Sequence, residues 1–195
     1  MFIEGTIQIV SEIGIENTRT RDVAKYAGFS EATMYRRFPT KEILLREAFL
    51  IIDKRLSDLL TESDFIQKPG DSPFEPGIYR VWQTIYHYLI DHREETIFLI
   101  RYRYSSLYTD EVRSMRQAYN GGFDNAYQVF ENKYGSVKHS YQGFLVNYIF
   151  EMTLCFAEKV ISRKLEDCEE TEDCIWLAVS SAAKALTRDR KAENG

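Results

Sequence analysis

Cationic side chains cluster between residues 18 and 41 of a chain that is acidic as a whole. The 195 residues have a net charge of −5, but this segment holds six cations and two carboxylates, a local net charge of +4. The cations are Arg19, Arg21, Lys25, Arg36, Arg37 and Lys41, and the carboxylates are Asp22 and Glu31. Such a patch can contact the phosphates of a nucleic acid, because each neutralised phosphate releases counterions. A solvated charged surface is the alternative interpretation.

The residues around Gly28 predict two short helices that would position these cations. The first helix is expected from about residue 19 to 27 and the second from about 30 to 38. Gly28 supplies the left-handed backbone that ends the first helix, and Ser30 is a good N-cap for the second. Thr18 is a candidate cap for the first helix, because Arg19 stands where a capping hydroxyl is common.

Two further helices are expected to flank this pair. Apolar residues at helical spacing predict a helix over residues 2–13, and Gly14 ends it. On the other side, Pro39 blocks continuation of the second short helix, and Thr40 can cap a longer helix over about residues 41–60.

The apolar positions of the two short helices form one seam, and the remaining positions point outward. The seam, which would pack the pair against the helix over 2–13, consists of Val23, Ala27, Phe29, Met34 and Phe38. Ala24 is small enough to let the helices cross closely. The outward residues of the second helix are Ser30, Glu31, Ala32, Thr33, Tyr35, Arg36 and Arg37. Small, hydroxyl, aromatic and guanidinium groups on one exposed face suit the major groove of DNA, so the pair is predicted to be a helix-turn-helix.

Residues 5–45 resemble the DNA-binding domain of the tetracycline-repressor (TetR) family of bacterial regulators. The matching segments are Gly14-Ile15-Glu16, Thr20-Arg21-Asp22-Val23-Ala24, Ala27-Gly28-Phe29-Ser30, Thr33-Met34-Tyr35 and Arg37-Phe38-Pro39-Thr40-Lys41-Glu42-Ile43-Leu44. The rest of the chain matches the family only in length and in its all-helical character. The resemblance implies a homodimer, a palindromic double-stranded DNA operator and a small-molecule effector.

The resemblance also implies roles for individual residues. Thr20 and Arg21 correspond to residues that touch a phosphate or a base edge, Tyr35 to a tyrosine that contacts the DNA backbone, and Lys41 to a phosphate-binding lysine. Ser30, Ala32 and Thr33 open the recognition helix. Arg36 and Arg37 are expected to make one phosphate contact and one guanine contact. Glu31 has two interpretations: its carboxylate accepts from a cytosine amine, or it only favours the positive end of the helix.

Beyond the cluster the sequence is helical almost throughout, so the fold class is all-α. Apolar periodicity predicts helices over about residues 78–91, 93–105, 110–134, 138–164 and 172–187, with an interruption at 120–122 and a loop over 67–77. We expect an N-terminal three-helix DNA-binding domain over residues 1–45 and a helical effector-binding and dimerisation domain over residues 46–195.

Aromatic residues are concentrated in the central helices. The candidate ligand-binding residues are Trp82, Tyr86, Phe98, Tyr102, Phe123, Tyr127 and Phe130. A cavity lined by such rings would suit a flat or amphipathic effector, although each ring taken alone fits an ordinary core equally well. Arg101 and Arg103 alternate with tyrosines, so one of these arginines could face inward and meet an anionic group, or pair with a nearby carboxylate instead.

The last two long helices carry apolar stripes that are broader than one core requires. This breadth indicates a second buried face, as in a four-helix interface between two copies of the chain, and it predicts a homodimer through these helices. A dimer would place two recognition helices about one DNA turn apart, in register with a palindrome.

Several functions are not indicated by the residues. No catalytic grouping stands out, so no enzyme activity and no cofactor are predicted. His87 and His92 are five residues apart, a poor spacing for a shared metal ion. Cys155 is expected in the core, and Cys168 and Cys174 are expected to stay reduced, because no signal peptide is recognised. No apolar run is long enough to span a bilayer, and we expect a cytoplasmic protein.

The leading hypothesis is therefore a ligand-responsive transcriptional regulator, most simply a repressor released from its operator by a hydrophobic or aromatic effector. The alternative is a helical protein that binds a hydrophobic ligand or partner and has weak or lost DNA affinity. The acidic Glu31 motivates this alternative, as does the start of the sequence almost inside the first helix, where the family often has a preceding basic arm.

Overall fold

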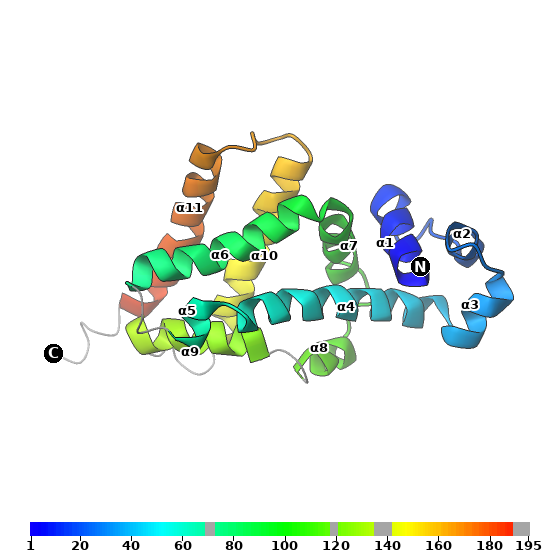
Figure 1. The fold of residues 1–195 in the computed structure, drawn as a ribbon, viewed down its shortest axis with the longest axis horizontal. Helices are drawn as coiled ribbons and strands as arrows, with labels where there is room; N and C mark the ends of the chain where they lie inside the picture. The colour runs from blue at the N-terminus through cyan, green and yellow to red at the C-terminus, as the bar shows by residue number, and fades with distance from the viewer. Residues whose placement is uncertain (69–72, 118–120, 135–141, 189–195) are drawn as a thin grey trace. The chain divides into compact units, whose positions relative to one another are not determined.

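The computed structural model describes residues 1–68, 73–117, 121–134 and 142–188, and this part of the chain holds eleven helices and no strand (Figure 1). The all-α prediction is confirmed. The helices are α1 (Phe2–Ile13), α2 (Thr20–Tyr26), α3 (Glu31–Arg37), α4 (Lys41–Thr61), α5 (Asp64–Gln67), α6 (Phe74–Asp91), α7 (Arg93–Arg103), α8 (Asp110–Gln117), α9 (Gly121–Tyr134), α10 (Gln142–Ile161) and α11 (Glu169–Arg188). The short α5 ends where the loop over residues 67–77 was expected to begin, and α6 starts at Phe74, inside that expected loop.

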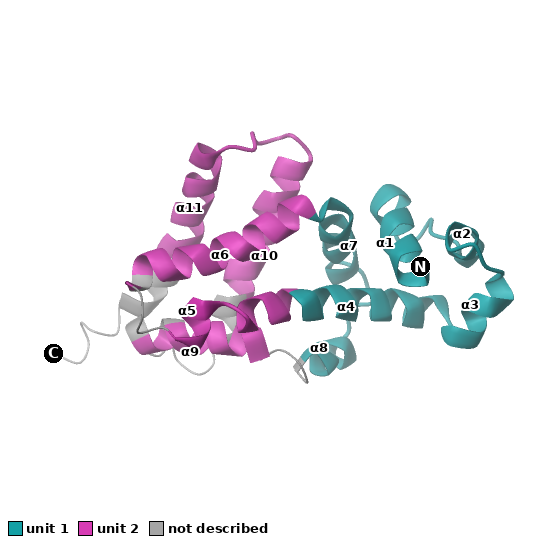
Figure 2. Cartoon of the chain, in the orientation of Figure 1, with its two compact units in different colours: residues 1–55, 92–119 teal, residues 56–91, 120–195 magenta. Residues whose placement is uncertain are grey.

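The chain divides into two compact units (Figure 2). Unit 1 comprises residues 1–55 and 92–119, and unit 2 comprises residues 56–91 and 120–195. Helices α7 and α8 thus share a unit with the N-terminal helices. The border after residue 45, which we expected between a DNA-binding and an effector-binding domain, concerns function rather than compactness and stays a prediction.

The N-terminal helices of unit 1 enclose a small apolar core. Its buried members come from α2, α3, the turn after α3 and the start of α4: Val23, Ala24, Met34, Phe38 and Leu44. Phe2 and Ile3 of α1 pack against them. Phe29 was predicted in this seam, but 45% of its surface is exposed. Its ring lies at the edge of the core against Phe2, with centroids 5.4 Å apart. The turn therefore directs Phe29 to the surface while the other seam residues are buried.

The remaining helices of unit 1 hold α1 and α4 by charged contacts. Arg101 of α7 donates to the carbonyl oxygen of Val10 near the end of α1. On α4 the fully buried Asp53 accepts from Arg116 Nε of α8 at 2.7 Å, and Arg116 also donates to the Tyr108 hydroxyl at 2.8 Å. A buried ion pair of this kind is strongly destabilised when one partner is removed, because the other charge is left in the interior.

Unit 2 is built by close contacts between helices. Gly77 of α6 lies against the Phe65 ring of α5, and Gly122 of α9 lies against the Ser57 carbonyl of α4 so closely that no Cβ would fit at either glycine. Helix α10 packs on both α6 and α11. Cys155 of α10 was expected in this core, but it is exposed, as are Cys168 and Cys174, and all three are free thiols. The apolar pattern of α10 is broader than its buried face, which explains the wrong placement of Cys155.

Candidate nucleic-acid interface

The turn between α2 and α3 sets the position of α3, the predicted recognition helix. Gly28 has φ +76°, and its amide donates to the Lys25 carbonyl at 3.1 Å while the Phe29 amide donates to the Ala24 carbonyl at 2.9 Å. These two bonds form the Schellman motif that ends many helices, and they require a residue that adopts the left-handed region without strain. The predicted role of Gly28 is confirmed.

The start of α3 is fixed by its own side chains. The Ser30 hydroxyl accepts from the Thr33 amide at 3.2 Å, as predicted for an N-cap. The hydroxyls of Ser30 and Thr33 are 2.9 Å apart, and Arg36 Nη2 donates to Thr33 Oγ1 at 3.2 Å. Arg36 is thereby directed along its helix, and its other N–H groups remain available for a ligand. Thr18 does not cap α2: its hydroxyl donates instead to the Gly14 carbonyl at 2.7 Å, and Arg19 is the N-cap residue.

A second set of hydrogen bonds joins α2 to α3. Thr20 Oγ1 donates to the carboxylate of Glu31, and the same oxygen lies 3.1 Å from the Tyr35 hydroxyl. Thr20 is the first residue of α2, and Glu31 and Tyr35 lie one helical turn apart on α3. The structure therefore brings Thr20, Glu31 and Tyr35 into one contact group, a connection that spacing along the sequence does not reveal.

The other predicted DNA-contacting residues lie outside this contact group. Arg21 and Ala32 are exposed, and Arg37 is exposed with its guanidinium 5.7 Å from the centre of the Phe38 ring. Lys41 is half-buried and donates from Nζ to the Ile15 carbonyl at 2.6 Å, so it also ties α4 to the segment between α1 and α2. Two of the three ammonium hydrogens remain for a phosphate.

The start of α4 adds a negative charge beside this lysine. The Thr40 hydroxyl accepts from the Ile43 amide at 3.2 Å, which confirms Thr40 as a cap. The backbone amide of Glu42 and the hydroxyl of Thr40 lower the pKa of the Glu42 carboxyl below its ordinary value. Glu42 is therefore a carboxylate at neutral pH, next to Lys41 at the positive end of the helix.

A shallow groove of about 710 Å³ opens on the same part of unit 1. Its floor is mainly apolar and its rim carries two guanidinium groups; the lining residues are Met1, Phe2, Ile3, Phe29, Thr33, Arg36, Arg37 and Phe38. Phe2 and Phe29 were not predicted to border the interface. The hydrophobicity of Phe29 indicated a core position, but the turn at Gly28 directs its ring to the surface against Phe2.

The candidate ligand-binding rings are buried and fall into separate contact groups. In unit 1, Tyr102 stacks on Phe49 at 4.7 Å and lies 6.0 Å from Phe98, and burial raises the pKa of Tyr102 to about 12. In unit 2, Phe123 meets Phe150 edge to face at 5.6 Å, and Tyr127 lies buried on the same helix as Phe123. The side chain of Phe130 lies outside the described residues.

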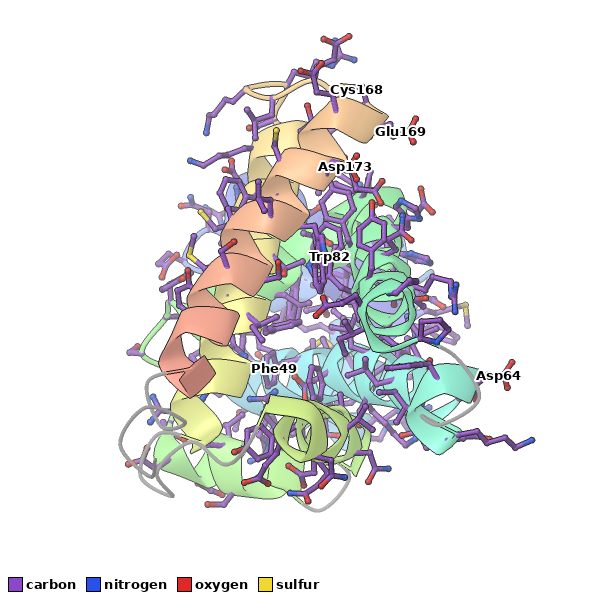
Figure 3. All side chains as sticks on the ribbon, turned by 90° about the vertical axis from the view of Figure 1, so that its left-hand side faces the viewer. Phe49, Asp64, Trp82, Cys168, Glu169 and Asp173 are labelled. Carbon is purple, nitrogen blue, oxygen red and sulfur yellow. The ribbon has the colours of Figure 1, made fainter. Side chains whose placement is uncertain are left out.

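Trp82 and Tyr86 belong to a further group in unit 2, which we call the ring cluster: Tyr79, Trp82, Tyr86 and Trp176. Trp82 stacks with Tyr86 at 5.0 Å and meets Trp176 of α11 at 5.4 Å. Its indole N–H donates to Thr153 at 2.9 Å. Burial raises the pKa of Tyr86 to about 12. The cluster joins α6 to α10 and α11, and Figure 3 labels Trp82 together with Asp173 of α11.

A carboxylate borders the ring cluster. Glu172 accepts from Gln83 at 2.6 Å and from His87 at 2.9 Å, and the Tyr79 hydroxyl donates to Asp173 at 2.8 Å. Burial by itself would raise the pKa of the Glu172 carboxyl, but the hydrogen bonds from His87, Gln83 and Tyr79 outweigh it, and this pKa lies below its ordinary value. No group of three His, Cys, Asp or Glu residues suited to a metal ion occurs within the described ranges.

Comparison with known proteins identifies the family to which this helix-turn-helix is similar. A family described as bacterial regulatory proteins of the tetR family matches residues 2–48, which contain α1, α2, α3 and the start of α4. The chain belongs to the TetR family. As a TetR-family protein it is a transcriptional regulator with an N-terminal helix-turn-helix, and residues 1–45 are called the reader below. No curated protein matches the chain.

Solved structures share the fold with this TetR-family chain over nearly its whole length. A TetR family transcription regulator from Marinobacter aquaeolei VT8 has a TM-score of 0.76 at 21% identity, covering 93% of this chain and 92% of that one. One from Shewanella sp. PV-4 has a TM-score of 0.76 at 17% identity, covering 93% and 95%. The fatty acid degradation regulator FadR from Bacillus halodurans has a TM-score of 0.66 at 17% identity, covering 96% of each chain. At these identities the likeness shows the fold alone.

Proposed function

We propose that this TetR-family regulator binds a palindromic DNA operator as a homodimer and is released from it by a small hydrophobic or aromatic effector. Residues 1–45 read the DNA in this proposal, and residues 46–195 bind the effector and form the dimer. The observation that carries it is the exposed, capped recognition helix, whose outward face combines hydroxyl and guanidinium groups over a rigid turn. Such a face can hold phosphates and read base edges together.

The dimer is supported by a stripe on α11. Cys174, Leu177, Ala178 and Ser181 are all exposed and follow the i, i+3, i+4, i+7 spacing of one helix face. Leu177 is 66% exposed, although it is a large apolar side chain in the middle of a long helix. Ile175 and Val179 of the same helix belong to the core of the chain itself.

The dimer is tested by sedimentation of the full chain and of Leu177→Asp. We expect a dimer for the wild type and a shift toward monomer for the variant, because a buried carboxylate at a symmetric interface meets its own copy. Tyr104→Asp is the matched control, since Tyr104 is 73% exposed but lies outside α11. An unchanged dimer in Leu177→Asp contradicts this interface.

Sequence-specific DNA binding is tested by selecting bound sequences from a random duplex pool. The affinity for the most enriched sequence is then measured between 50 and 200 mM salt. We expect this sequence to be a palindrome. Arg36→Ala and Arg37→Ala should weaken binding, and loss of a phosphate contact should reduce the slope of log affinity against log salt by about 0.9. Arg80→Ala is the matched control, because Arg80 is an exposed arginine on α6. Equal losses in all three variants contradict the assignment, and no binding by the wild type favours a ligand-binding protein without DNA affinity.

The effector is supported by the buried aromatic groups and is tested by fluorescence. Trp82 and Trp176 are the two tryptophans of the chain and touch each other, so tryptophan emission reports on the ring cluster. We propose a panel of aromatic and acyl compounds, including fatty acids because one similar structure is of a fatty acid degradation regulator. A compound that changes the emission should also lower DNA affinity. Emission changes with unaltered DNA binding would contradict its role as effector.

A further inference from the structure

The hydrogen bonds between Thr20, Glu31 and Tyr35 have a fixed direction. A carboxylate can only accept, so the single hydroxyl hydrogen of Thr20 is donated to Glu31. The Thr20 oxygen is then left as an acceptor, and the Tyr35 hydroxyl 3.1 Å away donates to it. The result is a chain of hydrogen bonds that runs from Tyr35 through Thr20 and ends on the Glu31 carboxylate.

These hydrogen bonds use the two hydroxyl hydrogens that a DNA phosphate would need. A phosphate oxygen, like a carboxylate, can only accept from a hydroxyl. In the DNA-free reader neither Thr20 nor Tyr35 has a hydrogen left for it. A phosphate that takes the Thr20 hydrogen must therefore replace Glu31, and one that takes the Tyr35 hydrogen must replace Thr20 as its acceptor. The phosphate and Glu31 also repel each other, because both are anions.

We propose that Glu31 is an internal substitute for a DNA phosphate: it accepts the Thr20 hydrogen, and thereby keeps Thr20 as the acceptor of the Tyr35 hydrogen, until an operator phosphate displaces it. The proposal rests on the proposed function, because it requires that the reader binds DNA. It explains an acidic residue in a cationic recognition surface. All three side chains lie at the surface: Thr20 and Glu31 are half-buried, and Tyr35 is 41% exposed.

Glu31 is a specificity-determining residue in this arrangement. A well-placed operator phosphate recovers both hydroxyl hydrogens when it displaces the carboxylate. A phosphate of unrelated DNA that sits less favourably breaks the same hydrogen bonds and recovers less. Unrelated sequences are thus penalised more than the operator, which increases the difference between the two affinities.

The test is a double-mutant cycle on a mixed-sequence duplex, measured by fluorescence anisotropy at low salt with the full chain. The proteins are wild type, Glu31→Ala, Tyr35→Phe and the double variant. We expect Tyr35→Phe to change the affinity of the wild type less than twofold, because its hydrogen is already committed. In the Glu31→Ala background Thr20 can donate its own hydrogen to the Tyr35 oxygen, which leaves the Tyr35 hydrogen for the phosphate. Tyr35→Phe should then cost about tenfold, the size of a hydrogen bond to a charged group.

Two controls separate the hydrogen bonds from the loss of a negative charge. Glu31→Gln removes the charge but keeps an oxygen that accepts from Thr20. Tyr35→Phe should therefore change the DNA affinity very little in that background. Asp22→Asn removes the other carboxylate of the segment, which approaches Arg21 rather than Thr20. It should raise affinity by charge alone and leave the effect of Tyr35→Phe unchanged. Melting curves of each variant report folding directly.

Four outcomes decide the proposal. An equal cost of Tyr35→Phe in both backgrounds, or weaker binding of the mixed-sequence duplex by folded Glu31→Ala, overturns it. Binding of the mixed-sequence duplex by Glu31→Ala alone, while the wild type binds only its selected operator, supports it strongly. If wild type and Glu31→Ala both fail to bind any duplex at low salt, the proposed DNA binding fails first and the role of Glu31 falls with it.

Discussion

The reader surface and the ring cluster hold their chemically important groups in opposite ways. In the reader, the predicted DNA-contacting side chains are exposed or half-buried and rest on a small core that contains Val23 and Met34. In unit 2, rings such as Trp82 and Tyr86 are themselves the core, at 5% and 2% exposure. The reader separates function from stability, whereas a substitution in the ring cluster changes both.

The two regions also use a carboxylate differently. Glu31 accepts from Thr20 and lies at the surface, where in our proposal a DNA phosphate competes for that donor. Glu172 accepts from His87 and Gln83 and has a side chain only 15% exposed, so it is held between helices rather than offered to a ligand. In our proposal the same chemical group is therefore exchangeable in one region and structural in the other.

The largest expected effect is that of Trp82→Ala. Removing a buried tryptophan costs about 3–5 kcal/mol of unfolding free energy, because the ring contacts and the hydrogen bond to Thr153 are lost and a cavity remains. Trp82→Phe keeps a ring and should cost much less. Urea unfolding followed by circular dichroism measures both. A loss below about 1 kcal/mol for Trp82→Ala would mean that Trp82 lines a collapsible pocket rather than the core.

Within the reader, Gly28→Ala should cost about 1–2 kcal/mol, the price of a left-handed backbone for a residue with a Cβ. Nothing lies within 4 Å of the Cβ position at Gly28, so the cost is conformational and not steric. Gly28→Asn should cost less, because asparagine tolerates this region better. Thermal unfolding compares the three proteins. Equal stability of the wild type and Gly28→Ala would show that the backbone of the turn moves out of the left-handed region in the variant.

These turns explain why the reader could be predicted and much of the rest could not. Local features of the reader depend on neighbours within six residues and can therefore be predicted from short stretches of sequence. They are the Schellman turn at Gly28 and the caps at Ser30 and Thr40. The contact between Thr20 and Glu31 spans eleven residues and depends on how two helices cross.

Placement in the rest of the chain depends on longer separations still. Trp82 meets Thr153 across 71 residues, and Tyr79 meets Asp173 across 94. Apolar periodicity predicted the long helices there but could not say which of their faces is buried. Cys155 was wrongly placed for this reason, and the candidate ligand-binding rings stay a prediction.

A smaller effect is expected for the arginines of the recognition helix. Arg36→Ala and Arg37→Ala should each change the unfolding free energy by less than about 0.5 kcal/mol, because both side chains are exposed. The same proteins should lose DNA affinity, which separates function from folding in the reader. Chemical unfolding in parallel with binding assays tests this. A stability loss comparable to that of Gly28→Ala would remove the contrast with the ring cluster.

The smallest effect is expected from the pH dependence at Glu172. Its pKa is lower in the folded chain than the ordinary value of 4.5, so its contribution to stability is complete above that value and is lost as the pH falls toward the lowered pKa. Glu172→Gln should therefore reduce stability at pH 7 and make the decline between pH 5 and pH 3 shallower. Glu170→Gln is the matched control, since Glu170 is an exposed carboxylate in the same first turn of α11. Unfolding at a series of pH values measures the slopes. Identical slopes of stability against pH for Glu172→Gln and the wild type would show that the hydrogen bonds from His87 and Gln83 do not favour the ionised carboxylate. The contrast with Glu31 would then lose its electrostatic basis.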